Sequence, residues 1–277
     1  MITGTITSTS TSTNDMRLVD AHCHLEAEEF RGQLDALLAE ARAAGVVKLV
    51  TASVTPEQWP VSRALGRYYP EVAFAWGVHP WYAEARHFEL LDALRGARAA
   101  GASAIGEIGL DAKIETPPMA LQERMFTEQL SIAKENDLPV VLHCRGAFNE
   151  LIRILNQVGA PARGGLVHAF SGSVEIAEAL MDHGIRFSMG GALTYKPSRK
   201  RVAVLDRIYP GHFLLETDSP DLPPVQAREG PNVPANILHN LAGAAAILGL
   251  PEEEIAARTT DNAYRLFGFP EVDHATP

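Results

Sequence analysis

The sequence contains very little cysteine: only Cys23 and Cys144 occur in 277 residues. A fold held together by disulfides is therefore excluded, because such a fold needs several cysteine pairs. Each cysteine directly follows a histidine at the end of an apolar run. Since side chains alternate along a strand, we expect both sulfurs to point into an apolar layer, as buried structural residues rather than as a thiolate ligand or a nucleophile.

Basic residues are also scarce, with 24 Lys and Arg against 34 Asp and Glu and a net charge of -10. This balance argues against a protein that coats nucleic acid or a membrane surface, but it leaves phosphate chemistry at a local cationic site open. No apolar run approaches the ~18 residues of a membrane helix. Residues 1–15 have neither the basic nor the apolar region of a secretory signal. We expect a cytoplasmic protein with no membrane association and no obligate protein partner.

The chain is expected to hold one folded domain. Residues 1–15 are mostly Ser, Thr, Gly and Asn and are predicted to be a disordered extension, and residues 271–277 form a short tail. Residues 16–270 contain no linker that would divide them. Their number is close to the ~250 residues that a TIM barrel typically needs.

Short runs rich in Val, Ile, Leu and Phe alternate with longer amphipathic segments, which is the pattern of repeated βα units. Strands are predicted at 17–22, 46–52, 72–78, 103–108, 139–143, 165–169, 185–189 and 212–217. Helices are predicted at 28–44, 56–69, 83–100, 119–136, 147–159, 173–182 and 198–208, with more helix after 233. No GxGxxG follows the first strand and no GxxxxGK[ST] occurs, which weakens the case for an open nucleotide-binding sheet. The predicted fold is α/β, a (β/α)8 TIM barrel.

Side chains that can bind metals stand at the ends of apolar, β-like runs. There are six of them: His22, His24, Glu107, His143, His168 and Asp218. Active sites of TIM barrels lie at the carboxyl ends of the strands, so residues from five different strands can meet there. One histidine at a strand end is more often structural, but six ligands in equivalent positions are not explained that way. The pattern predicts a metal centre.

Six ligands exceed the needs of one tetrahedral ion, so we expect two divalent ions per chain. Four imidazoles and two carboxylates suit Zn, Mn, Co or Ni, and Mg is less suited to so much nitrogen. Glu107 is the natural bridge, because each of its oxygens can serve one ion. The other ligands would divide between the ions, with His22, His24 and Asp218 on one and His143 and His168 on the other. Asp218 could orient or deprotonate the attacking water, which makes Asp218 and Glu107 the candidate catalytic residues.

Three further residues are predicted near a substrate. His79, in Gly77-Val78-His79-Pro80, ends the third strand and would contact either a ligand or the substrate. Arg145 follows His143 by two residues, and its guanidinium could bind a phosphate or form a structural ion pair. Lys196 opens a basic run over 196–201 that is either a phosphate contact or a solvated cluster. Cations at a helix N-terminus oppose the helix dipole, which gives weight to a phosphate partner.

Blocks of this sequence resemble those of the TatD family of metal-dependent deoxyribonucleases. In family order they are Asp20 to Leu25, Gly77 to Pro80, Ala104 to Asp111, Leu142 to Arg145, Val167 to Ser173, Leu215 to Pro220, and Asn262 with Arg265 to Phe267. The resemblance covers residues 18 to 267. It implies a TIM barrel of the amidohydrolase superfamily, the six residues above as metal ligands, and metal-dependent hydrolysis of DNA.

Two segments depart from the usual family pattern. Family members usually carry an aromatic residue soon after the Gly-Leu-Asp of the fourth strand, but here Asp111 is followed by Ala112-Lys113-Ile114-Glu115-Thr116. Asp221 stands where many members have another aromatic residue. Both segments border the expected site. The six candidate metal ligands are thus retained, whereas the residues around the site that would select the substrate differ from the usual family pattern.

Our leading hypothesis is a phosphodiesterase that cleaves single-stranded DNA or DNA ends with a water activated by two metal ions. An alternative keeps the ions but takes a small ester, amide, lactone or phosphoester, and it is motivated by the unusual rim and the negative charge. A third hypothesis, a non-catalytic barrel that serves as a scaffold, is opposed by the intact ligand set. Metal analysis combined with a panel of substrates would distinguish the three.

Overall fold

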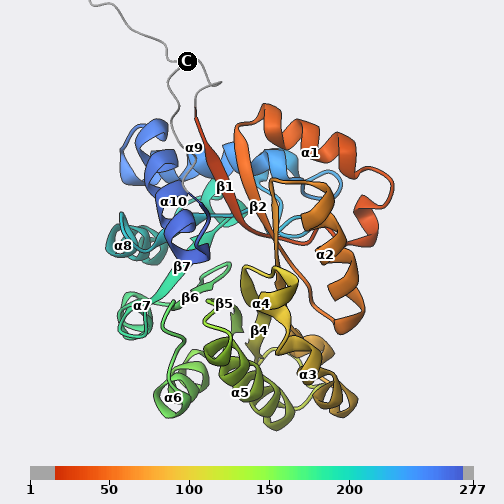
Figure 1. Ribbon diagram of the computed structural model, residues 1–277. Coiled ribbons are helices and arrows are strands. Elements are labelled where there is room, and N and C mark those ends of the chain that lie inside the picture. Colours follow the sequence, from red (N-terminus) through yellow and green to blue (C-terminus); the bar gives the residue numbers. More distant parts are fainter. Residues whose placement is uncertain (1–15, 271–277) are drawn as a thin grey trace, which may run out of the picture.

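The computed structural model describes residues 16–270, which form eight parallel strands with helices around them (Figure 1). Neighbouring strands pair in sequence order from β1 to β8. Their bounds are β1 (Leu18–Cys23), β2 (Val46–Ala52), β3 (Val72–Trp76), β4 (Ala104–Asp111), β5 (Val140–Arg145), β6 (Gly165–Val167), β7 (Ile185–Met189) and β8 (Phe213–Leu215). The predicted (β/α)8 TIM barrel is confirmed. The predictions for residues 1–15 and 271–277 fall outside the described residues.

Helices follow the strands as the sequence predicts. The longer ones are α1 (Leu34–Ala43), α2 (Trp59–Tyr68), α5 (Met119–Glu135), α6 (Phe148–Val158), α7 (Val174–Met181), α8 (Arg199–Ile208), α9 (Ile237–Leu248) and α10 (Glu252–Phe267). Short 3-10 turns lie at η2 (Glu28–Phe30), η3 (Pro56–Gln58), η6 (Gly191–Thr194), η7 (Val225–Ala227) and η8 (Pro234–Asn236). Within residues 16–270, no helix is both long enough and apolar enough to cross a membrane.

The segment after β3 differs from the continuous helix expected over 83–100. It contains two 3-10 turns, η4 (Pro80–Tyr82) and η5 (Ala85–Leu90), and two short helices, α3 (Leu91–Leu94) and α4 (Ala97–Ala100). Gly96 lies between the two helices, and Gly101 ends α4 with a φ of 96°. Glycine adopts this left-handed backbone without a steric penalty, so it stops a helix efficiently.

Two apolar clusters hold the strands in place. The cluster of mostly small residues comprises Val19, Ala21, Val50, Ala52, Ala73, Ala75, Ala104, Val141, Leu166 and Leu214 from the strands, with Ala263, Leu266 and Phe267 from α10. The larger cluster joins strand residues such as Ile105 to helix residues such as Phe126 and Leu130. Because seven of the eight strands contribute apolar residues to both clusters, the strand ends form a firmly packed platform for side chains.

The first and last strands, β1 and β8, meet at a seam. On its other side β1 pairs with β2, and that register shifts between Asp20 and Cys23. After β8, the Asp218 backbone N–H donates to the His22 carbonyl at 2.9 Å, and the His24 N–H donates to the Ser219 carbonyl at 2.8 Å. These bonds bring the two ends of the barrel together at its carboxyl face.

Candidate metal centre

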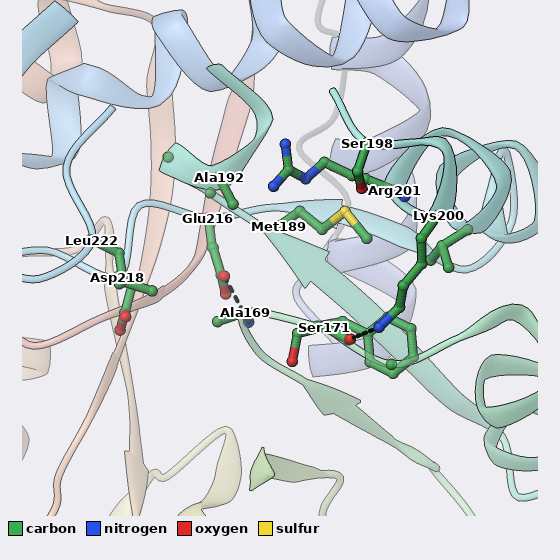
Figure 2. A pocket seen from close by; sticks show the side chains of 15 residues that line it. Ala169, Ser171, Met189, Ala192, Ser198, Lys200, Arg201, Glu216, Asp218 and Leu222 are labelled. Carbon is green, nitrogen blue, oxygen red and sulfur yellow. Dashed lines mark hydrogen bonds between the residues drawn. The ribbon is translucent and has the colours of Figure 1, made fainter. Parts of the chain in front are cut away.

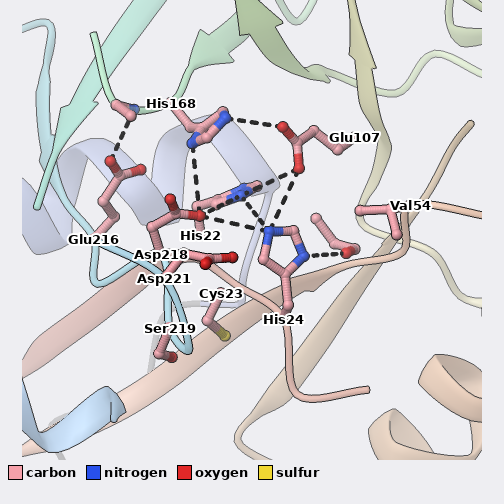
Figure 3. Close-up of polar contacts among 12 residues, drawn as sticks. His22, Cys23, His24, Val54, Glu107, His168, Glu216, Asp218, Ser219 and Asp221 are labelled. Carbon is pink, nitrogen blue, oxygen red and sulfur yellow. Dashed lines mark hydrogen bonds and ion pairs between the residues drawn. The ribbon is translucent and has the colours of Figure 1, made fainter. Parts of the chain in front are cut away.

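All six predicted ligands converge at the carboxyl end of the barrel. His22 lies in β1, Glu107 in β4 and His143 in β5, while His24, His168 and Asp218 directly follow or lie just beyond β1, β6 and β8. Figure 3 shows His22, His24, Glu107, His168 and Asp218 turned toward one another. Groups of three drawn from these residues and His79 have candidate ligand atoms within 4.8 Å of one another. The convergence predicted from the strand ends is therefore present.

One group of ligand atoms joins β1 to the loop after β8. His22 Nε2 lies 3.3 Å from His24 Nε2 and 3.3 Å from Asp218 Oδ1. Glu107 Oε2 lies 3.4 Å from His22 Nε2 and 3.5 Å from His24 Nε2. The four atoms thus surround one point with two nitrogens and two oxygens.

The other oxygen of Glu107 faces a second group. Glu107 Oε1 lies 2.8 Å from His168 Nε2 and 3.2 Å from His143 Nδ1. These two nitrogens are 3.2 Å apart. Glu107 therefore contributes one oxygen to each of two neighbouring groups, which is the arrangement of a carboxylate shared between two sites.

The geometry of both groups fits divalent metal ions. Ligand atoms about 2.1 Å from a tetrahedral zinc ion are about 3.4 Å from one another, and the spacings above are close to that value. The tautomers also fit: His24 Nδ1 lies 2.8 Å from the Ala52 carbonyl, so it carries the proton and leaves Nε2 free as a ligand. Burial and contact with two ionised carboxylates are the conditions under which imidazoles bind a cation.

The site carries concentrated negative charge. Burial alone would raise the pKa of Glu107, but the neighbouring His168, His79 and His22 lower it well below its usual range. The pKa of Asp218 is likewise lowered, against the effect of burial, by its contacts with the His22 and His24 rings. Both carboxylates therefore stay ionised in a place where a divalent cation would neutralise them.

His79 touches Glu107 rather than standing apart from the ligands. Burial lowers the pKa of His79 to about 4, so its ring is neutral. Its Nδ1 accepts the Trp81 backbone N–H at 3.1 Å, so Nε2 carries the proton and faces Glu107 Oε1 at 3.3 Å. Both roles expected for His79 are compatible with this position, since it contacts Glu107 and also lines the cavity above the ligands.

Asp111 is a functional neighbour that the sequence analysis did not identify as a site residue. Its Oδ2 lies 3.2 Å from His143 Nε2, 2.6 Å from Trp81 Nε1 and 3.0 Å from Arg145 Nε. Burial would raise the pKa of Asp111, but the hydrogen bonds, led by that from Trp81, lower it to about 2. An ionised Asp111 holds the proton of His143 on Nε2 and leaves Nδ1 free to bind a metal.

Strand alternation could have identified this residue. Glu107 and Asp111 are four positions apart in β4, so they share one strand face. Glu216, two positions before Asp218, is another buried carboxylate near the ligands. Its carboxylate accepts the Ala169 N–H at 2.8 Å and the Ser188 hydroxyl, and so it supports the loop that follows β6.

A cavity of about 500 Å³ opens above the ligands. Trp81 and Tyr82 from η4 contribute to its wall and are 45% and 44% exposed. The Arg145 guanidinium lies 5.5 Å from the centre of the Trp81 ring. Both roles considered for Arg145 are compatible with this position, since it pairs with Asp111 and also lines the cavity.

Lys196 is not brought to the ligands. It is exposed and lines neither this cavity nor the smaller one beside it. The difference arises because α8 begins at Arg199, so that Lys200 and Arg201, in its first turn, line the smaller cavity. The basic run was correctly placed on the face of the site, but its cavity-lining members are these two residues.

A TIM barrel with buried His, Glu and Asp groups at the carboxyl ends of its strands has the architecture of a metal-dependent hydrolase. Comparison with known proteins agrees and is more specific. The model of the family described as TatD related DNase matches residues 19–268, and the chain belongs to this family.

Several relatives match nearly the whole chain. The uncharacterised metal-dependent hydrolase YjjV of Escherichia coli is 35% identical over 257 residues, which are 92% of this chain and 99% of YjjV. YabD of Bacillus subtilis, named in the same way, is 34% identical over 90% of this chain and 98% of its own. A Danio rerio protein, tatdn3, is named as a proposed deoxyribonuclease and is 30% identical over 90% of this chain and 96% of its own. The YjjV crystal structure superposes with a TM-score of 0.86 at 34% identity, covering 92% of this chain and 99% of YjjV.

Proposed function

We propose that this hydrolase cleaves phosphodiester bonds in DNA, at single strands or frayed ends, with two divalent ions that share Glu107. The proposal rests on the positions of the two Glu107 carboxylate oxygens. Oε2 faces His22 and His24, whereas Oε1 faces His143 and His168. The description of the matched family as TatD related DNase and the name of tatdn3 supply the substrate class.

The donor set defines which residues would hold each ion. His22 Nε2, His24 Nε2 and Asp218 Oδ1 would bind one with Glu107 Oε2, and His143 Nδ1 and His168 Nε2 would bind the other with Glu107 Oε1. The excess of imidazole nitrogen favours Zn, Mn, Co or Ni over Mg.

Two divalent ions at such a site lower the pKa of water and offset the charge that develops on phosphoryl oxygens during hydrolysis. Asp218 lies at the boundary of the cavity and can orient the attacking water or accept its proton. Arg145 supplies a positive charge that can bind a non-bridging phosphate oxygen. Trp81 and Tyr82 offer half-exposed rings on which a base can stack, and stacking selects single strands over a closed duplex.

A small ester, amide, lactone or phosphoester is the second candidate substrate class. Glu29 and Asp221 line the same 500 Å³ cavity, and their negative charges oppose the approach of a polyanion. The volume is within the range of sites for small molecules, about 300–1,000 Å³. This candidate requires the same ions and differs only in what the water attacks.

The proposal is tested by measuring metal content and the release of nucleotides from single-stranded DNA with Zn, Mn, Co, Ni and Mg. We expect close to two ions per chain and hydrolysis that depends on them. His24→Ala and Glu107→Gln should abolish hydrolysis, whereas His183→Ala, a change at a partly exposed histidine outside the site, should leave it intact. Wild-type protein that takes up both ions, leaves DNA intact and hydrolyses small esters would establish the second candidate instead.

A further inference from the structure

A second, smaller cavity of about 220 Å³ adjoins the ligands on the side of β6, β7 and α8. Figure 2 shows Lys200 and Arg201 on one side of this cavity and Asp218 with Leu222 on the other. Met189 and Glu216 lie between these two sides (Figure 2). The cavity is therefore bounded by the cationic first turn of α8 and by the loop that carries a metal ligand.

The two cavities share part of their walls. Ala169, Ser171, Asp218 and Leu222 line both. Ala169, Asp218 and Leu222 have φ angles of 45°, 58° and 46°. Non-glycine residues seldom hold this left-handed backbone, and it persists only where the surrounding structure fixes it. The partition between the cavities is thus a defined wall at the metal centre.

The cations of the small cavity have only neutral partners. Lys200 Nζ donates to the Ser171 carbonyl at 2.6 Å, and an Arg201 Nη1 lies 3.5 Å from the Tyr195 carbonyl. Among residues 16–270, no carboxylate lies within ion-pair distance of either side chain. Both cations beside this cavity therefore keep a charge that no neighbouring carboxylate in the described part of the chain compensates.

The acidic residues of the cavity do not neutralise these cations. The two Glu216 oxygens accept hydrogen bonds from the Ala169 N–H and the Ser188 hydroxyl. Asp218 turns its Oδ1 toward His22 and His24. The cavity therefore retains positive charge on its α8 side, where a ligand with several acceptor oxygens can be bound by Lys200 and Arg201.

We propose that this cavity binds the terminal phosphate of a DNA strand while the neighbouring phosphodiester lies at the metal ligands. This inference rests on the proposed function and specifies its substrate class as phosphorylated strand ends. At 220 Å³ the cavity is below the usual range for binding a whole small molecule, so it suits a phosphoryl group, whereas the 500 Å³ cavity has room for the nucleoside. A terminal phosphate, which carries more charge than an internal one, gains most from two cations.

The experiment compares short oligothymidylates that carry a 5′-phosphate, a 3′-phosphate or no terminal phosphate. The strands carry phosphorothioate linkages, which resist hydrolysis, and equilibrium binding is measured with the metal-loaded wild-type protein. We expect one of the phosphorylated forms to bind about tenfold more tightly than the unphosphorylated form, and the form that does so identifies the recognised end. Adding Lys200→Met and Arg201→Met should remove this preference.

Arg207→Ala is the matched control, because it removes one positive charge from the same helix at an exposed position that does not line the cavity. It should leave the phosphate preference unchanged. Equal binding of all three oligothymidylates, or a preference that survives the Lys200→Met and Arg201→Met changes, would overturn the inference. The proposed function is tested separately, by cleavage of the unphosphorylated phosphodiester strand with the wild-type protein. Cleavage without a preference for a terminal phosphate would contradict only the further inference. If the wild-type protein cleaves no DNA, the proposed function itself is contradicted.

Discussion

Asp20 and Thr217 lie 197 positions apart in the chain and are joined by two hydrogen bonds across the seam between β1 and β8. The Thr217 backbone N–H donates to Asp20 Oδ1 at 2.9 Å, and the Thr217 hydroxyl donates to Oδ2 at 2.5 Å. Both residues are completely buried and each is close to a metal ligand in sequence. The support of the metal centre and the closure of the barrel thus depend on the same contact.

Thr217→Val should destabilise the protein by about 1.5–3 kcal/mol, because it leaves a buried carboxyl group without one of its donors. Urea unfolding of the metal-free protein measures this change. Thr260→Val is the control, since the Thr260 hydroxyl donates to the Arg17 carbonyl in a partly buried place away from the seam. The control should lose no more than about 1 kcal/mol. If both variants lose the same free energy of unfolding, the contact between Asp20 and Thr217 contributes no more to stability than the control hydrogen bond.

Removing divalent ions should lower the melting temperature. A ligand present at about 100 times its Kd stabilises a protein by about 2.7 kcal/mol, which corresponds to roughly 5 °C or more for a domain of this size. Thermal unfolding with a chelator and after metal is restored measures the shift. Glu107→Gln should abolish most of the shift, and His183→Ala, at a partly exposed position outside the site, should retain it. If the melting temperature of the wild-type protein is the same with and without metal, the assignment of the ligands is contradicted.

Asp111→Asn should weaken metal affinity or activity by about 10–100-fold, because a neutral amide no longer fixes the proton of His143 on Nε2. Metal affinity is the decisive measurement, since a purely structural role would change stability and leave affinity alone. Asp111→Glu, which restores the charge, should recover part of the lost affinity. Unchanged affinity in Asp111→Asn would rule out this positioning role.

Asp221→Asn should lower the KM for single-stranded DNA by a few-fold at low salt, because it removes a negative charge from the wall of the main cavity. The effect should shrink as salt is added, since partly exposed charges are screened. Asp261→Asn on α10 provides the control, because Asp261 is an exposed acid paired with Arg265 and lies outside both cavities. An equal decrease in KM from both changes would indicate that the effect depends on the net charge of the protein and not on the position of Asp221.

The two cysteines should be inert in the folded protein. Burial raises the pKa of Cys144 to about 12 and raises that of Cys23 well above its usual value. Because the thiolate is the reactive form, a disulfide reagent should modify neither residue at pH 8, and reactivity should remain low as the pH approaches 10. Unfolding in guanidinium should expose two thiols per chain. A fast-reacting thiol in the native protein would contradict this expectation.

The barrel and the convergence of the six candidate ligands were predictable because both depend on local patterns. Alternation of apolar strands and amphipathic helices fixes the βα order, and the ends of parallel strands meet on one face. For this reason His22 and Glu107, more than 80 residues apart, could be assigned to one site from the sequence. The break in the helix after β3 was less predictable, because the apolar pattern continues through Gly96.

The substrate side of the site was predicted less well, because it depends on how loops turn. Trp81 and Tyr82 follow Pro80 in a short 3-10 turn, and their exposure at the cavity depends on tertiary packing. Lys196 and Lys200 belong to one basic run, and only the start of α8 decides which of them lines a cavity. Strand alternation was enough to place Asp111 on the same strand face as Glu107. Its proposed role could be recognised only from its contact with His143 in the structure.

The seam has a consequence for the synthesis of the protein. His22 and His24 leave the ribosome with the first strand, whereas Asp218 emerges about 200 residues later, after the eighth. A growing chain therefore holds only part of the first ligand group until β8 docks beside β1. We therefore expect hydrolytic activity only from the finished barrel, and we expect a truncated product that lacks the last strand to carry an incomplete ligand group and to be inactive.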